Sequence, residues 1–157
     1  MKNILLLCVG LLILSCESTS DTTTNQQESM TENIENTKKA IEETLKQETR
    51  YFCERNLEKW QEQWSQQPFV SKMYAGEKKF EEFTTWEEIN GFTVNHIAEN
   101  PDSIPIPETN YDLDIHLLGE TAWVFYSKTV DDKEVRETRF MVKEGDKWKI
   151  ARMQTVY

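Results

Sequence analysis

The sequence lacks the surplus of basic residues that a nucleic-acid-binding protein needs. Its 157 residues include 28 Asp and Glu but only 18 Lys and Arg, which gives a formal net charge of -10 at pH 7. Phosphate backbones and anionic lipid headgroups both attract positively charged surfaces. This balance therefore excludes nucleic acid as a partner and excludes purely electrostatic adhesion to a membrane.

The chain is also poor in the residues that build common cofactor and metal sites. It has 5 Gly, 3 Cys and 2 His. It contains no Gly-rich phosphate loop, no nucleophile elbow and no Cys/His spacing typical of a metal site. We therefore expect no cofactor and no metal. The 5 Trp, 5 Tyr and 7 Phe supply enough bulk for the core of one small domain.

An apolar run near the N-terminus has the pattern of a signal peptide. Lys2 provides a positive charge before it, and Ile4–Leu14 is apolar except for Gly10. This run is too short to span a bilayer comfortably. It ends in Ile13–Cys16, whose sequence Ile-Leu-Ser-Cys resembles the lipobox of bacterial lipoproteins.

The lipobox resemblance implies a lipid anchor on Cys16. It implies that residues 1–15 are a signal peptide, that diacylglycerol is attached to the Cys16 thiol, and that the new amino terminus is acylated. Several acyl chains anchor a protein stably in a bilayer, so we expect a lipoprotein of the cell envelope. Glu17 stands where Asp favours the inner membrane in enterobacteria, which points to the outer membrane. The alternative is an ordinary secretory signal with a cysteine there by chance.

The remaining cysteines agree with export. Cys8 is lost with the signal peptide and Cys16 carries the lipid, so Cys53 has no partner for an intramolecular disulfide in the mature chain. Cys53 is then a reactive thiol, an intermolecular bridge, or a small apolar residue on a helix face. We favour the last interpretation.

Residues 16–30 are predicted to form a disordered tether, and residues 31–157 are predicted to form the domain. The stretch Ser18–Ser29 is rich in Ser, Thr, Asp, Asn and Gln and has no apolar residue. Ser29 and Glu32 are spaced as a capping box that opens a helix, and Pro68 is expected to end it. The apolar positions at helical spacing between them are Ile34, Ile41, Leu45, Phe52, Cys53, Leu57, Trp60 and Trp64.

The rest of the domain is predicted to hold a short strand, a second helix and a four-stranded antiparallel meander. Phe69–Tyr74 is the short strand, and Gly76–Glu82 is a charged loop. The second helix begins at one of two capping boxes, Thr84 with Glu87 or Thr85 with Glu88, and ends before Pro101. The four strands of the meander are predicted at Tyr111–Leu117, Thr121–Val130, Val135–Val142 and Trp148–Val156.

This order of elements resembles the NTF2-like, or SnoaL-like, superfamily over about residues 33–157. Gly145–Met153 looks like the final hairpin of these domains, and Gly119–Val124 resembles the strand start that precedes it. The resemblance implies an α+β fold in which a long N-terminal helix and a shorter helix pack on a bent antiparallel sheet and form a cone with a pocket. It implies no particular activity, because the superfamily includes enzymes as well as binding modules.

Asp112, Asp114 and His116 are the candidate catalytic residues. Their spacing places them on one face of a strand, where two carboxylates and an imidazole suit acid/base chemistry or a weak metal site. The alternative, which we favour, is the solvated face of a half-buried strand, because such alternation normally has that origin.

A ligand pocket is predicted between the first helix and the concave face of the sheet. Its candidate lining residues are Phe52, Trp60, Trp64, His96 and Arg139. Tyr51 is a further polar group that can reach inside. Large side chains on the inward stripe of the helix make a concave apolar site plausible. The alternatives are that the aromatic residues fill the cone, that His96 is structural and that Arg139 pairs with a surface carboxylate.

The sequence thus favours a non-catalytic envelope lipoprotein that binds a small apolar ligand or a protein partner. The alternative is a lyase or isomerase that acts in the cone by acid/base chemistry. A homodimer through the sheet is also expected, because Ala122–Tyr126 has apolar side chains on both faces and only one face can pack under the helices. The alternative cover for the outer face is the connector Pro101–Pro107 or the first helix.

Overall fold

The structure is a computed structural model that describes residues 20–107, 112–130 and 132–157. The predicted signal peptide, Cys16 and the first part of the predicted tether lie outside these residues. The described helices are α1 (Ser20–Cys53), α2 (Leu57–Gln61) and α3 (Trp86–Glu99). The described strands are β1 (Ser71–Ala75), β2 (Phe80–Phe83), β3 (Asp114–Leu118), β4 (Thr121–Val130), β5 (Lys133–Glu144) and β6 (Lys147–Val156). The chain divides into two units, Met1–Ile34 and Glu35–Tyr157, and the site described below lies within the second.

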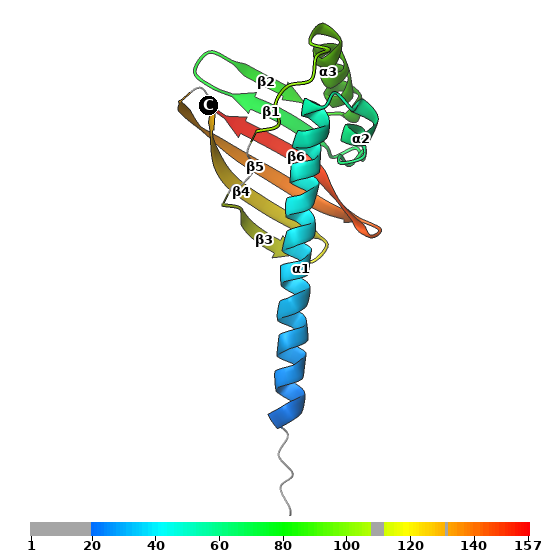
Figure 1. Cartoon of the computed structure of the whole chain (residues 1–157), viewed down its shortest axis with the longest axis vertical. Helices are drawn as coiled ribbons and strands as arrows, with labels where there is room; N and C mark the ends of the chain where they lie inside the picture. Colours follow the sequence, from blue (N-terminus) through cyan, green and yellow to red (C-terminus); the bar gives the residue numbers. More distant parts are fainter. Residues whose placement is uncertain (1–19, 108–111, 131) are drawn as a thin grey trace, which may run out of the picture. The chain divides into compact units, whose positions relative to one another are not determined.

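The strands form one sheet in the order β2-β1-β6-β5-β4-β3 (Figure 1). The predicted antiparallel meander β3–β6 is confirmed, but β3 begins at Asp114, so Asp112 lies before the strand on which it was predicted. The sheet also has a parallel pair, because β1 lies beside β6. The register between β5 and β6 shifts at Phe140/Met141, and a bulge of this kind bends the strand that carries it. The bend contributes to the curvature that Figure 1 shows in the long strands.

The prediction of a charged loop at Gly76–Glu82 was wrong in part. Phe80–Phe83 forms β2, which pairs with β1 in antiparallel fashion. Its sequence, Phe-Glu-Glu-Phe, does not alternate between apolar and polar residues as a half-buried strand does, and Phe80 is 68% exposed at the edge of the sheet. Pairing with β1 satisfies the backbone groups of a sequence that has little apolar surface of its own to bury.

The first helix differs from its prediction at both ends. It begins at Ser20, so Ser29 and Glu32 lie inside the helix and do not open it. It ends at Cys53 instead of continuing to Gln67. The chain turns back there in a Schellman arrangement, in which Asn56 N donates to Tyr51 O and Arg55 N donates to Phe52 O.

Arg55 takes the left-handed position of this turn, with φ of 60°. That position usually belongs to Gly because a side chain there is strained. Two hydrogen bonds hold Arg55 in place, from Nε to the backbone oxygen of Asp102 and from Nη1 to that of Phe52. Asn56 then caps α2 by accepting a hydrogen bond from Lys59 N. The apolar stripe that was predicted to form one helix is therefore divided between α1 and α2, and its last residue, Trp64, follows α2 and forms a β-bridge with Ile150.

Thr85 and Glu88 form the capping box of α3, which settles the two alternatives in favour of this pair.

The core lies between the helices and one face of the sheet. It contains Ile41, Leu45, Trp60, Trp64, Val70, Ile89, Ala122, Val124, Met141, Trp148, Ile150 and Met153. Cys53 is buried and free, as expected for a small apolar residue, and burial raises the pKa of its thiol. Of the helices that the structure describes, none is long and apolar enough to cross a bilayer.

Candidate functional site

Inward-facing side chains of neighbouring strands form two rows across the concave face of the sheet. The register pairs Lys72 of β1 with Met153 of β6, and Met153 with Arg139 of β5, so these residues form the first row. Residues two positions along a strand point to the same face. The second row is therefore Tyr74, Thr155, Glu137 and Tyr126.

A cavity of about 280 Å³ lies over these rows, hereafter the concave cavity. Its volume is close to the lower end of the range of about 300–1,000 Å³ that is typical of small-molecule sites. Glu48 and Phe52 of α1 line it opposite the sheet, and Pro107 lines it from the connector before β3. The cavity therefore lies between the first helix and the concave sheet, where the sequence predicts a pocket.

Glu137 is the centre of a buried ion-pair cluster in this cavity. Its Oε2 accepts hydrogen bonds from Nη1 of Arg139 and, at 3.0 Å, from the hydroxyl of Thr155. Its Oε1 lies 2.7 Å from Nζ of Lys128. Burial alone would raise the pKa of Glu137, but Arg139 and Lys128 more than offset burial and hold that pKa below its ordinary value. The carboxylate is therefore ionised at neutral pH and is a poor proton acceptor.

Arg139 is 4% exposed, and one of its side-chain donors has no acceptor among the described residues. Its buried Nε finds no acceptor among the residues that the structure describes. Burial would lower the pKa of Arg139, but the oxygens of Tyr126 and Glu137 outweigh burial and raise it. The guanidinium therefore stays charged. A buried donor without an acceptor costs roughly 1–3 kcal/mol, and a ligand oxygen beside Nε would remove that cost.

Lys72 is a second cation at 4% exposure. Its Nζ lies 5.3 to 5.8 Å from the centroids of four aromatic rings, within the range of cation–π contacts. The rings are those of Trp60, Trp64, Tyr74 and Phe92. No carboxylate of the described residues forms an ion pair with it. Burial lowers the pKa of Lys72 to about 8, although Glu48 acts in the opposite direction.

Glu48 approaches the cavity from α1 and is held by the core. Its Oε1 accepts a hydrogen bond of 2.8 Å from Nε1 of Trp60. Trp60 is fully buried, and its ring contacts those of Trp64 and Trp86. The tryptophan core therefore fixes the orientation of a carboxylate that faces the cavity.

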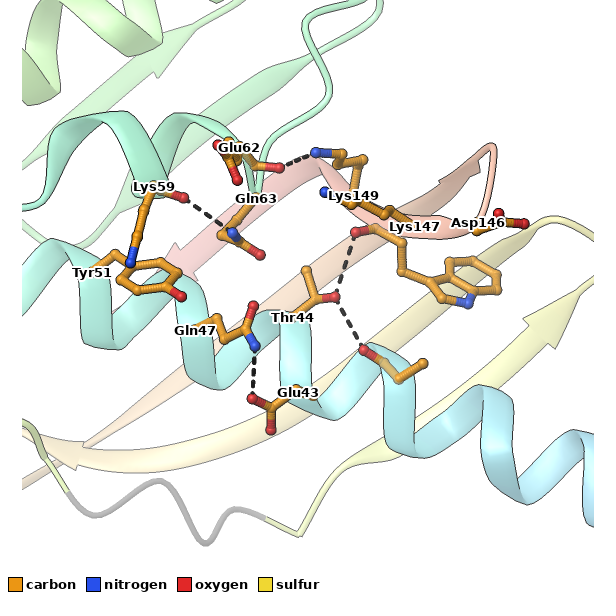
Figure 2. Close-up of a pocket in the computed structure, with 12 residues that line it drawn as sticks. Glu43, Thr44, Gln47, Tyr51, Lys59, Glu62, Gln63, Asp146, Lys147 and Lys149 are labelled. Atoms are coloured by element: carbon orange, nitrogen blue, oxygen red, sulfur yellow. Dashed lines mark hydrogen bonds between the residues drawn. The ribbon is translucent and has the colours of Figure 1, made fainter.

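A second hollow of about 340 Å³ lies where α1, α2 and the start of β6 meet. Figure 2 shows that its polar side chains bond largely to one another or to nearby backbone. Gln47 donates to Glu43 at 2.8 Å, Gln63 donates to the backbone oxygen of Lys59 at 3.0 Å, and Nζ of Lys149 donates to the backbone oxygen of Glu62. Its ionisable residues balance, with Lys59, Lys147 and Lys149 against Glu43, Glu62 and Asp146. The concave cavity, with its buried cations and spare donor, is therefore the candidate site.

Comparison with known proteins places the fold. No family model and no curated protein matches the chain. Several solved structures do match. A protein of unknown function from Shewanella oneidensis MR-1, described as NTF-2 like, aligns with a TM-score of 0.52 and 18% identity over 76% of this chain and 98% of its own. A second, from Silicibacter pomeroyi DSS-3, aligns with a TM-score of 0.59 and 6% identity over 78% of this chain and 96% of its own.

A third structure, described as an NTF2-like protein with a cystatin-like fold, comes from Novosphingobium aromaticivorans. It aligns with a TM-score of 0.55 and 14% identity over 88% of this chain and 91% of its own. This domain has an NTF2-like fold. Identities this low show the fold alone, so the activity must be argued from the site of the NTF2-like domain itself.

The candidate catalytic residues of the NTF2-like domain lie outside the concave cavity. Asp112, Asp114 and His116 are all exposed. Nε2 of His116 lies 2.9 Å from Oδ2 of Asp114, on a solvated face of β3. Within the described part of the chain, no group of three or more His, Cys, Asp or Glu side chains is arranged to hold a metal ion.

The structure places the candidate pocket residues in four different surroundings. Phe52 and Arg139 line the concave cavity. Trp60 and Trp64 belong to the core instead, with 0% and 1% exposure. His96 is half-buried and stacks on Phe52 at 5.5 Å between ring centroids. Tyr51 lines the second hollow.

Lys72, Glu48 and Glu137 are cavity residues that were not predicted from the sequence. For Glu137, a signal was present, because it alternates with Val135, Arg139 and Met141 at inward positions of a strand. Charged residues at such positions are rare and point to a buried polar site. For Glu48, a signal was also present, because it lies three residues after Leu45 and four before Phe52 on the apolar stripe of α1. For Lys72, facing depends on the pairing of β1 with β6, which local periodicity does not reveal.

Proposed function

We propose that this protein is a lipid-anchored lipoprotein of the cell envelope whose NTF2-like domain binds a small ligand in the concave cavity. The observation that carries the binding role is the spare donor of Arg139, buried in a cavity of about 280 Å³. Buried polar groups are normally satisfied, and a bound ligand supplies the missing acceptor. Because the lining is largely polar, we propose a polar ligand in place of the apolar ligand that was expected from the sequence.

A binding role is favoured over catalysis because both carboxylates of the cavity are engaged. Glu137 is bonded to Arg139, Lys128 and Thr155, and Glu48 accepts from Trp60. A general base needs a pKa near the operating pH, whereas that of Glu137 is lowered. The alternative, a lyase or isomerase, would use Lys72 as its base. A ligand recovered chemically unchanged after prolonged incubation supports binding.

The proposed site can be tested with a substitution that places a larger side chain in the cavity. Met153 lies between Lys72 and Arg139 on the floor of the cavity, so Met153→Phe should remove ligand volume. Met73 lies on the opposite face of β1, and Met73→Phe is the matched control. In a thermal-shift screen of small polar metabolites, we expect hits for wild type and for the control, and at least a tenfold loss of affinity for Met153→Phe. Equal binding by all three proteins would contradict the proposed site.

Membrane anchoring at Cys16 completes the proposed function. It is supported by the lipobox resemblance. With a net charge of -10, the chain would be repelled by anionic lipid headgroups, so attachment to a membrane requires a lipid anchor in place of electrostatic adhesion. The outer membrane is the proposed location because Glu17, and not Asp, follows the cysteine. We expect this anchor to hold the NTF2-like domain near the membrane surface.

We also propose a homodimer through the outer face of the sheet. Phe125 is 42% exposed there, and the ring of Trp123 contacts those of Phe125 and Phe140 at 6.2 and 4.8 Å. These three rings form an apolar patch on strands whose other face is in the core. Light scattering should give twice the monomer mass for wild type, and the monomer mass for Phe125→Glu. A wild-type protein that stays monomeric at high micromolar concentration would contradict the dimer.

A further inference from the structure

We propose that the concave cavity binds a small organic acid in its carboxylate form, with the carboxylate between the Lys72 ammonium and the Arg139 guanidinium. This inference rests on the proposed function and names the ligand class of the same site. The two cations lie in one row with Met153 between them. Strands are spaced about 4.8 Å apart, so the two Cα atoms are roughly 10 Å apart and both long side chains can reach one carboxylate.

Charge in the cavity leaves these two groups available to an anion. Among the described lining residues are three cations, Lys72, Lys128 and Arg139, and two carboxylates, Glu48 and Glu137. Glu137 already binds Lys128 and Nη1 of Arg139, which leaves the ammonium of Lys72 without an ion-pair partner and Nε of Arg139 without an acceptor among the described residues. The surplus of one positive charge is notable in a chain whose net charge is -10.

The size of that surplus favours a monoanion such as a carboxylate over a dianion. One negative charge neutralises the surplus, whereas a dianion would leave an uncompensated charge in a buried site. Carboxylate oxygens also form strong charge-assisted hydrogen bonds with guanidinium and ammonium donors. Phe52, Pro107 and Met153 provide apolar surface beside the cations. The lining therefore suits a compact acid with an apolar body.

Binding of a carboxylate beside Lys72 is coupled to protonation of that lysine, whereas binding of a neutral ligand is not. Lys72 faces Glu48 of α1, Arg139 and Glu137 of β5 and its neighbour Tyr74 on β1. Burial and Arg139 together lower the pKa of Lys72 to about 8, against the opposing effect of the two carboxylates. A bound carboxylate would raise the pKa of Lys72. Binding therefore takes up a proton near pH 8, and affinity falls as pH rises above that value.

The test uses the full chain in a non-ionic detergent and a panel of matched compounds. Each carboxylic acid of two to ten carbons is paired with its primary amide, for example 3-phenylpropionate with 3-phenylpropanamide, and inorganic phosphate is included. Affinities are measured by isothermal titration calorimetry at pH 7 and pH 9.5. We expect at least one acid to bind tenfold or more tightly than its amide at pH 7, and to lose most of that advantage at pH 9.5.

Lys72→Met and Lys79→Met form the matched pair of variants. Lys79 also lies over the Tyr74 ring, at 5.9 Å, but its side chain is 60% exposed. Lys72→Met removes a buried charge and keeps the length of the side chain, so it is expected to fold. It should lose tenfold or more in affinity for the acid, keep its affinity for the amide and show no pH dependence. Lys79→Met should bind as wild type does.

The outcomes separate this inference from the function on which it rests. If amides bind as tightly as acids, or if phosphate binds in preference, the carboxylate proposal is overturned and the cavity remains a ligand site. If Lys72→Met leaves acid binding unchanged, the assignment of the carboxylate to Lys72 is wrong. If no acid and no amide binds to wild type, both the inference and the proposed function fail.

Discussion

Replacing Glu137 with alanine is expected to lower the free energy of unfolding by about 3–5 kcal/mol, the typical cost of breaking a buried ion pair from one side. The substitution leaves Arg139, which is 4% exposed, without its carboxylate partner. Chemical denaturation followed by circular dichroism measures the change. Glu134→Ala on the same strand is the control, because its side chain is 62% exposed beside Arg136 and exposed pairs contribute about 0–1 kcal/mol.

A double variant identifies the cause of this loss. Glu137→Leu combined with Arg139→Met removes both charges and keeps similar volume, so it should recover most of the lost stability. The pH dependence has a definite sign. The folded-state pKa of Glu137 is lowered, so its contribution is present above the unfolded pKa of about 4.3 and is lost as pH falls through the folded value. A double variant that is as unstable as the sum of the single losses would show that the pair has no special role.

Replacing Cys16 with alanine is expected to abolish lipid attachment completely. The acyl chains of a lipobox cysteine act together, whereas a single chain binds a membrane only weakly, with an association constant of about 10⁴ M⁻¹. Without the thiol, no diacylglycerol can be attached, and the protein should accumulate as an unprocessed or soluble form. In detergent phase separation, the soluble form should move to the aqueous phase, and the unprocessed form should be identified by the mass of the retained residues 1–15.

Cys53→Ala is the matched control for this experiment. Cys53 is a free cysteine at 3% exposure, so its loss should affect stability and leave the lipid anchor intact. Intact-mass spectrometry of the wild-type mature chain provides the decisive reading. An unmodified Cys16 in that chain would rule out the lipoprotein assignment.

Local sequence signals predicted the elements that depend on neighbouring residues. The capping box of Thr85 and Glu88 opens α3, and the turns at Gly119 and Gly145 have the positive φ that glycine favours. The alternation of Asp114 and His116 correctly indicated a solvated strand face. These features rest on short-range physics and can be read from a single sequence.

The missed features depend on contacts distant in the chain or on unusual residues at key positions. Arg55 ends α1 where Gly is normally expected, and it is held there by a carbonyl of the distant Asp102. The parallel pairing of β1 with β6 brings Lys72 beside Met153 across 81 residues of sequence. The cavity and Arg139 in its lining could therefore be predicted from the sequence and its resemblance of fold, but the place of Lys72 in that lining could not.

The most direct test of the proposed site is a crystal structure of the full chain with the tightest-binding acid of the panel. Electron density for the acid is expected in the concave cavity, with carboxylate oxygens within hydrogen-bonding distance of Nε of Arg139 and Nζ of Lys72. Density in the second hollow, lined by Gln47 and Lys149, or on the outer face of the sheet, with no density for the acid in the concave cavity, would contradict the proposed site.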